Sequence, residues 1–361
     1  MIRFLHAADL HLDSPFSALS PEKAAARRQE QRDVIARMIE AANAYGCDAV
    51  LLAGDAFDAD NAYPDTIEAL RRAFAACQAQ IFIAPGNHDC CRPGSAYLTE
   101  AWPENVHIFK SNRIEAVELP KLGLRVYGAG FLRPYENSLL EGFTAKQDGM
   151  TNLMVLHGDA LSVGSLYNAV NREQIAASGL HYLALGHIHQ HSGLQKAGGT
   201  CYAWPGCAMG RGFDELGEKG VYLGTLDGGE CTLEFLSLGA RKYEILTVQP
   251  GDDPAAAIEA ALPAGTENDI YRIVLTGESE PLPMQALYAA FAPRFFSLSL
   301  RDETVPLRDL WEGMEEDTLR GLYLRQLKEQ YDRADETQRR TVALAVRLGV
   351  AAMEGREMTQ W

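Results

Sequence analysis

The chain has 361 residues, a formal net charge of −16 and seven cysteines. Its length exceeds one typical hydrophobic core and predicts two domains, while its acidic balance argues against a free-standing DNA-binding protein, whose contact surface is normally basic. Because the sequence has no C-x-x-C pair, no apolar run of about 18 residues and no signal-peptide pattern, we expect a cytoplasmic protein without membrane association.

The N-terminal half alternates between segments typical of strands and of helices. His6 lies inside the first strand and is interpreted as a hydrogen-bonded core histidine. Ser20 and the proline after it are typical of a helix start, and Gly46 is typical of a helix end. The alternation predicts an α/β core, and the Gly-rich, β-type stretch 200–238 suggests a second sheet packed on the first. The predicted strands are 2–8, 47–54, 79–86, 124–130, 151–158 and 181–189, and the predicted helices are 21–45, 66–77 and 171–178.

The pattern changes after about residue 240, so we expect two domains, residues 1–240 and 241–361. From about Glu315 onward, apolar residues recur at helical spacing. These C-terminal helices either cover a core or form a docking surface for a partner. They follow a smaller α+β module of β-α-β-α-β order, with strands at 241–250, 269–277 and 294–300 and helices at 254–262 and 283–291.

Polar clusters follow five of the predicted strands in the first domain. Asp9 and His11 are two residues apart, so a continuing strand would point both side chains to the same face. In open α/β sheets, ligands bind beyond the carboxyl ends of the strands, so we expect all five clusters to converge there. The clusters are Asp9-Leu10-His11, the GDAFD motif 54–58, the GNHD motif 86–89, His157 in LHGD, and the GHIH motif 186–189.

The donors in these clusters mix carboxylate and amide oxygens with imidazoles and include no thiolate. This mixture suits two divalent ions of borderline or hard character, with Mn²⁺ expected first and Fe²⁺ or Zn²⁺ as alternatives. Asp55 is the natural bridge between the two ions, because the glycines at positions 54 and 86 permit close backbone approach. The candidate metal ligands are Asp9, His11, Asp55, Asn87, His157, His187 and His189.

Two further residues complete the expected chemistry of phosphoester hydrolysis. A hydroxide that bridges the ions would attack the phosphate, and His88 beside Asn87 is the best candidate acid to protonate the leaving oxygen. Asp58 would orient His88 through its other ring nitrogen. His88 and Asp58 are therefore the candidate catalytic residues.

Several neighbouring residues have structural interpretations. Asp13 is either a turn or cap residue or a group that supports the site, and Asp89 is expected to brace a turn. Arg211 either meets a phosphate or pairs with Asp214 or Glu215.

The five motifs resemble the signature of the calcineurin-like metallophosphoesterase superfamily, which runs D-x-H, G-D-x-x-D, G-N-H-[DE], a lone His and G-H-x-H. All five stand in this order between residues 9 and 189. The resemblance implies a four-layer αββα sandwich and a smaller α+β capping domain after it. His88 matches the catalytic acid of the superfamily. The implied ligands are Asp9, His11, Asp55 and His189 for the first metal ion, and Asp55, Asn87, His157 and His187 for the second.

A narrower likeness is to bacterial DNA repair exonuclease subunits of the SbcD and YhaO type. It rests on these motifs and on the stretch WPGCAMGRGFDELGEKGVYL, residues 204–223. It implies a Mn²⁺-dependent DNA exo- or endonuclease, an SMC-like coiled-coil ATPase as partner and a homodimer. The alternative is a metallophosphoesterase that acts on a small phosphodiester or phosphomonoester, because Asp58 stands where some repair nucleases carry a histidine. A scaffold without activity is disfavoured, since such proteins lose ligands and none is missing here.

Overall fold

The computed structural model describes residues 1–58, 62–162, 164–306 and 309–355. The chain divides into two compact units whose segments alternate along the sequence. The first unit consists of Met1–Ile245, Ala264–Arg272 and Ala292–Ser299, and the second consists of Leu246–Pro263, Ile273–Phe291 and the chain from Leu300 onward. The single domain boundary expected at residue 240 stays a prediction.

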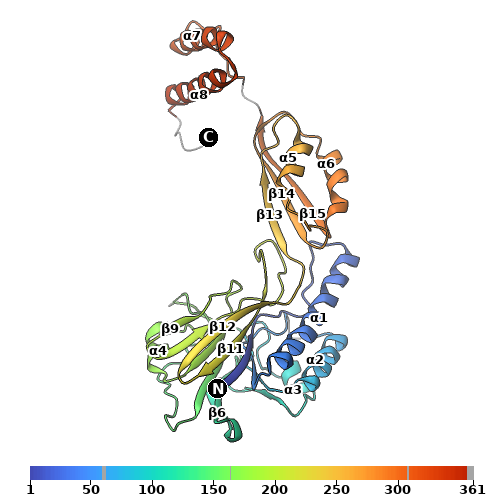
Figure 1. Ribbon diagram of the computed structural model, residues 1–361, viewed down its shortest axis with the longest axis vertical. Helices are drawn as coiled ribbons and strands as arrows, with labels where there is room; N and C mark the ends of the chain where they lie inside the picture. Colours follow the sequence, from blue (N-terminus) through green and yellow to red (C-terminus); the bar gives the residue numbers. More distant parts are fainter. Residues whose placement is uncertain (59–61, 163, 307–308, 356–361) are drawn as a thin grey trace. The chain divides into compact units, whose positions relative to one another are not determined.

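The first unit is built on two six-stranded sheets (Figure 1). In the first sheet, the neighbours β1 to β4 run parallel, and β11 pairs antiparallel with both β1 and β12. Its order is β12 (Glu230–Ser237), β11 (Gly220–Asp227), β1 (Ile2–Ala7), β2 (Ala49–Leu52), β3 (Gln80–Ile83) and β4 (Val106–Ile108). The order of the second sheet is β5 (Glu115–Leu119), β6 (Leu124–Gly128), β7 (Thr151–His157), β8 (Tyr182–Gly186), β10 (Thr200–Ala203) and β9 (Gln195–Ala197).

Three apolar clusters separate four layers of structure. Along β2, Leu51 points between the two sheets, whereas Val50 and Leu52 point to the opposite face, where helices cover the first sheet. Along β7, Val155 faces the intersheet core and Leu156 faces outward, where a short helix packs. The helices of the two outer layers are α1 (Pro21–Tyr45), α2 (Pro64–Ala76) and α3 (Ala96–Thr99) on one side and α4 (Arg172–Ala177) on the other. The expected α/β architecture with two stacked sheets is confirmed.

The first long helix starts and ends at the residues predicted from the sequence. The hydroxyl of Ser20 accepts a hydrogen bond from the backbone N–H of Lys23, and Gly46 ends α1 in a left-handed conformation with φ 68°. His6 is fully buried, and its ring nitrogens contact the Tyr182 hydroxyl and the Leu185 carbonyl at 2.9 Å each. The interpretation of His6 as a satisfied core histidine is confirmed.

The second unit includes most of the alternating C-terminal module. The three strands β13 (Tyr243–Val248), β14 (Ile270–Ser279) and β15 (Ser297–Pro306) form one sheet with β14 in the centre. The helices α5 (Pro254–Ala261) and α6 (Met284–Phe291) connect them in sequence, which confirms the expected β-α-β-α-β order. Two further helices, α7 (Leu319–Arg333) and α8 (Glu336–Met353), pack against each other, and the Tyr323 hydroxyl donates to the Ala345 carbonyl at 2.6 Å. Short 3₁₀ turns lie at Pro120–Leu122 and Ala292–Arg294. Within the described residues, no helix combines the length and the apolar character needed to cross a bilayer.

Candidate metal centre

The loop after β1 places the first two candidate ligands. β1 ends at Ala7, so Asp9 and His11 lie outside the strand, and both have left-handed backbones with φ of 50° and 43°. Hydrogen bonds from Asp9 N to Gly54 O (3.0 Å) and from His11 N to Asp55 O (2.9 Å) hold this loop beside the one that follows β2. The expected convergence of Asp9 and His11 is therefore observed, but the reason given for it was wrong. A strained loop, rather than strand alternation, brings them together.

Left-handed backbone recurs at two other candidate ligands. Asp55 has φ 50° and His187 has φ 90°. Non-glycine residues adopt this conformation at a cost of about 1–3 kcal/mol, and such residues cluster at functional sites. The His187 backbone N–H donates to both carboxylate oxygens of Asp9, at 3.1 and 3.0 Å. The strain at His187 is thus held by a hydrogen bond to another member of the site.

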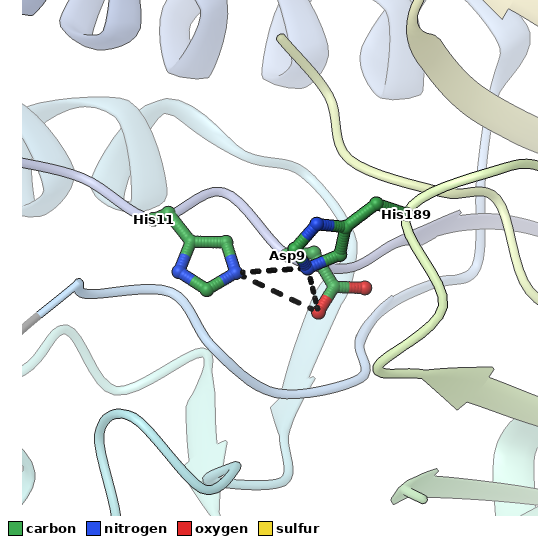
Figure 2. A group of neighbouring side chains, drawn as sticks. All are labelled: Asp9, His11 and His189. Atoms are coloured by element: carbon green, nitrogen blue, oxygen red, sulfur yellow. Dashed lines mark hydrogen bonds and ion pairs between the residues drawn. The ribbon is translucent and has the colours of Figure 1, made fainter. Parts of the chain in front are cut away.

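One group of donors consists of Asp9, His11 and His189 (Figure 2). Asp9 Oδ1 lies 3.9 Å from His11 Nε2 and 3.8 Å from His189 Nε2. The two Nε2 atoms lie 3.3 Å apart. Asp9 and His11 are fully buried, whereas the His189 side chain is partly exposed. Three ligand atoms from two distant parts of the chain therefore face a common point.

A second group of donors adjoins the first through Asp55. Asp55 Oδ2 lies 3.8 Å from His11 Nε2 and 3.5 Å from His157 Nε2. Asn87 Oδ1 lies 2.9 Å from His157 Nε2 and 3.2 Å from His187 Nδ1. Asp55 thus stands between the two groups, at the position expected of a carboxylate that bridges two ions. The structure brings all seven sequence-predicted ligands together.

The hydrogen bonds of three imidazoles determine which ring nitrogen faces the centre. In each ring Nδ1 meets an acceptor, so Nδ1 carries the proton and Nε2 keeps a lone pair. The acceptors are Asp58 for His11 (3.1 Å), the Ala53 carbonyl for His157 (2.9 Å) and Glu215 for His189 (2.7 Å).

This tautomer assignment tests whether the site suits metal ions. The Nε2 lone pairs of His11 and His189 face each other at 3.3 Å, and the lone pair of His157 faces the carbonyl oxygen of Asn87 at 2.9 Å. Two acceptors cannot hydrogen-bond to each other, but two ligands of one cation are arranged in this way. The donor set therefore fits divalent cations.

Burial keeps the imidazoles of His11, His157 and His187 neutral and disfavours the charged forms of Asp9 and Asp55. It lowers the pKa of His11 to about 3 and the pKa values of His157 and His187 to about 4. Burial also raises the pKa of Asp55 to about 7 and holds the pKa of Asp9 well above its ordinary value, with mutual repulsion adding to the shift of Asp9. A bound cation would accept lone pairs from the neutral imidazoles, and its charge would offset the cost of burying the carboxylates.

The two candidate catalytic residues lie beside the donors, but they do not pair as expected. The His88 backbone N–H donates to Asp55 Oδ1 at 2.9 Å, and its side chain is 46% exposed. Asp58 Oδ1 lies 4.0 Å from His88 Nδ1, which exceeds hydrogen-bond distance. The same oxygen instead accepts from His11 Nδ1 at 3.1 Å and from Arg211 Nη1 at 3.0 Å. Asp58 therefore orients His11 in this structure, because Arg211 and His11 hold its carboxylate away from His88.

The residues with open structural interpretations also have defined partners. Asp13 accepts from the backbone N–H of Tyr63 at 2.8 Å and so supports the start of α2. Asp89 accepts from the backbone N–H groups of Ala56 and Gly86 at 2.6 and 2.7 Å, so it braces both ligand loops as expected.

Sequence reasoning did not identify Glu215 as a site residue. It is 3% exposed and binds His189 and Arg211. Although burial opposes its ionisation, the hydrogen bonds from His189 and Arg211 hold the pKa of Glu215 far below its ordinary value. In the sequence, Glu215 was considered only as a partner of Arg211. The structure shows that Arg211 pairs with both Glu215 and Asp58.

Comparisons with known proteins identify the family of the chain. Residues 2–191 match the model of the calcineurin-like phosphoesterase family. The uncharacterized metallophosphoesterase YhaO of Bacillus subtilis (strain 168) is 35% identical over 246 residues, which cover 65% of this chain and 60% of that protein's length.

Two solved structures are also similar to the chain. One is TT1561 of Thermus thermophilus, with 12% identity and a TM-score of 0.40 over 65% of this chain and 98% of that one. The other is a dimetal phosphatase from Danio rerio, with 11% identity and a TM-score of 0.44 over 66% and 96%. Because the family model spans more than half of the chain, the protein belongs to the calcineurin-like phosphoesterase family.

Proposed function

We propose that this metallophosphoesterase is a two-metal phosphodiesterase and, more specifically, a Mn²⁺-dependent DNA exo- or endonuclease subunit that acts in DNA repair. The observation that carries the two-metal assignment is the position of Asp55. Its Oδ2 lies within 4 Å of ligand nitrogens from both donor groups. A single carboxylate between two sets of donors is the arrangement of a bimetallic hydrolase.

The side chains divide the work of hydrolysis among them. Two divalent ions bound there would supply positive charge to the phosphate and make a water molecule more acidic. Asp9, His11 and His189 would hold one ion, Asn87, His157 and His187 the other, and Asp55 both. The half-exposed imidazole of His88 lies at the rim of the site, where it can deliver a proton to a departing alkoxide.

The assignment of DNA as substrate rests on the sequence likeness to repair nucleases, which the five motifs and residues 204–223 carry together. The chain spans 60% of the length of its curated relative, so the activity, substrates and partners of the whole protein are proposals here. A net charge of −16 disfavours DNA binding by this chain alone. We therefore assign a basic DNA-binding surface to an SMC-like coiled-coil ATPase partner, and we place a homodimer of this chain in the cytoplasm.

The same net charge favours a second candidate substrate, a small phosphodiester or phosphomonoester. A small ester needs no extended basic groove, and an acidic surface does not repel it as strongly as it repels a polyanion.

A cleavage assay on end-labelled linear double-stranded DNA with Mn²⁺ separates the two candidates. Wild type is compared with His88→Ala, and bis-p-nitrophenyl phosphate serves as the small ester. His107→Ala, which removes an imidazole from β4, controls for general effects of losing a histidine. DNA cleavage that disappears in His88→Ala supports the nuclease. Turnover of the small ester with intact DNA, both without and with the ATPase, favours the second candidate, and hydrolysis of neither substrate refutes the proposed function.

A further inference from the structure

A single guanidinium connects the two carboxylates that orient the first donor group. Arg211 Nη1 donates to Asp58 Oδ1 at 3.0 Å, and Arg211 Nη2 donates to Glu215 Oε1 at 2.8 Å. The Arg211 backbone N–H adds a bond of 2.7 Å to the other Glu215 oxygen. The planar fork of arginine can hold two carboxylates in fixed directions at once.

Each of these carboxylates also contacts the imidazole of a candidate ligand. Asp58 contacts His11 Nδ1 at 3.1 Å, and Glu215 contacts His189 Nδ1 at 2.7 Å. The opposite nitrogens of the two rings meet at 3.3 Å beside Asp9. Asp58, Arg211 and Glu215, which we call the carboxylate brace, therefore set the tautomer and the direction of both imidazoles in one donor group.

The other donor group is held differently. The Nδ1 atom of His157 meets the backbone carbonyl of Ala53 at 2.9 Å, a group that no side-chain substitution removes. His157 is fully buried, and its orientation depends on the path of β2 and β7. The imidazoles of His11 and His189 thus rely on side-chain carboxylates for their orientation, whereas that of His157 relies on a backbone carbonyl.

We propose that Arg211 and Glu215 are positioning residues for the Asp9, His11 and His189 site, and that this site can be weakened through the brace while the His157 site keeps its affinity. The inference rests on the proposed function, because it assumes that both donor groups bind metal ions. Partners that orient metal-bound imidazoles typically change metal affinity by about 10–100-fold. Without the guanidinium, Asp58 and Glu215 would repel each other and Asp9, and both rings would lose their orientation.

Titration with Mn²⁺, followed by the EPR signal of the free ion, tests this without any activity measurement. In Arg211→Met we expect one of two Mn²⁺ equivalents to bind about 10–100-fold more weakly and the other to bind within about twofold of wild type. Arg211→Lys should weaken the same site by less, because an ammonium reaches one carboxylate at a time. Glu215→Gln should also weaken that site, since the amide cannot accept from Arg211 with both of its atoms.

Two reference variants identify the site and control for stability. His11→Ala removes a ligand of the first group, and combining it with Arg211→Met should not weaken the remaining site further. Arg125→Met removes another buried arginine, which lies on β6 and pairs with Asp148, and should leave both affinities unchanged.

Three results would overturn the proposal: wild-type affinities in Arg211→Met, equal weakening of both sites, or the same split in Arg125→Met. A wild-type protein that binds no Mn²⁺ would instead refute the proposed function and this inference with it.

Discussion

The turn after β3 approaches Asp55 so closely that a methyl group at Gly86 should misplace the bridging carboxylate. A Cβ atom on Gly86 would lie 2.7 Å from the Asp55 backbone nitrogen and closer still to Asp55 Oδ1, whereas ordinary contacts of this kind begin at 3.4 Å. Asp55 is 1% exposed, and its Oδ1 already accepts from the His88 backbone, so it has little freedom to turn aside. Relief of the clash therefore requires a shift of about 1 Å in one of the two ligand loops.

A shift of this size has consequences for binding and for rate. Misplacement by about 1 Å can lower activity about 10²-fold. Because Asp55 Oδ2 lies between both donor groups, we expect Gly86→Ala to weaken both Mn²⁺ sites and to lower kcat/KM by about 10²-fold or more. The assays are Mn²⁺ titration and hydrolysis of bis-p-nitrophenyl phosphate at saturating Mn²⁺.

Gly199→Ala is the matched control, because a Cβ atom there meets nothing within 4 Å and the backbone is not left-handed. It should behave as wild type in both assays. If Gly86→Ala also binds two Mn²⁺ ions and turns over within twofold of wild type, the loops yield without moving the carboxylate. The reasoning that Gly86 is required for the position of Asp55 would then be wrong.

Three further predictions concern His88, Asp55 and His6. His88→Ala should retain both Mn²⁺ ions and slow hydrolysis of DNA, whose alkoxide leaving group is poor, by about 10²–10⁴-fold. A Mn²⁺ titration and a single-turnover cleavage assay check this. Loss of metal would mean that His88 is a ligand rather than the acid. Asp55→Ala should lose metal from both sites together with activity, and retention of one tightly bound ion would show that Asp55 does not bridge. Burial lowers the pKa of His6 to about 3, so the folded state keeps it neutral and loses stability as the pH falls below about 6.5. From pH 7 to pH 5, wild type should lose about 2 kcal/mol of unfolding free energy more than His6→Gln, measured by urea denaturation, and equal losses would refute this buried-histidine argument.

The convergence of the candidate ligands could be predicted from the sequence because each of them lies near the end of a strand whose apolar pattern is strong. Asp55 and Asn87 lie in the loops that follow β2 and β3, and His157 is the last residue of β7. β2 and β3 are parallel neighbours in one sheet, which brings their carboxyl ends together. The elements missed include α3, β4, β5 and β9. They are three to five residues long, and β5 is largely exposed, so neither helical nor strand periodicity develops in them.

The supports of the site were harder to predict, because they depend on contacts that no local pattern records. Glu215 reaches His189 from a loop between β10 and β11, and nothing in the spacing of the two residues requires it. Asp58 was assigned to His88, but Arg211 draws its carboxylate toward His11. Residue type and order along strands thus predict which side chains converge, whereas the orientation of those side chains depends on tertiary packing.

The charge of the site bears on how an acidic chain could bind a phosphoester at all. Four carboxyl groups, those of Asp9, Asp55, Asp58 and Glu215, lie at the site, and Arg211 pairs with Asp58 and Glu215, so these protein groups alone would not attract a phosphate. Two divalent ions would make the charge at the site positive within a few ångströms, whereas the net charge of the chain would stay negative. Affinity for phosphate would then depend on metal loading and remain local to the scissile group. A small ester needs only that local positive charge, whereas a long DNA strand needs a positive surface from another chain. Identifying the substrate therefore also decides whether a basic partner is required.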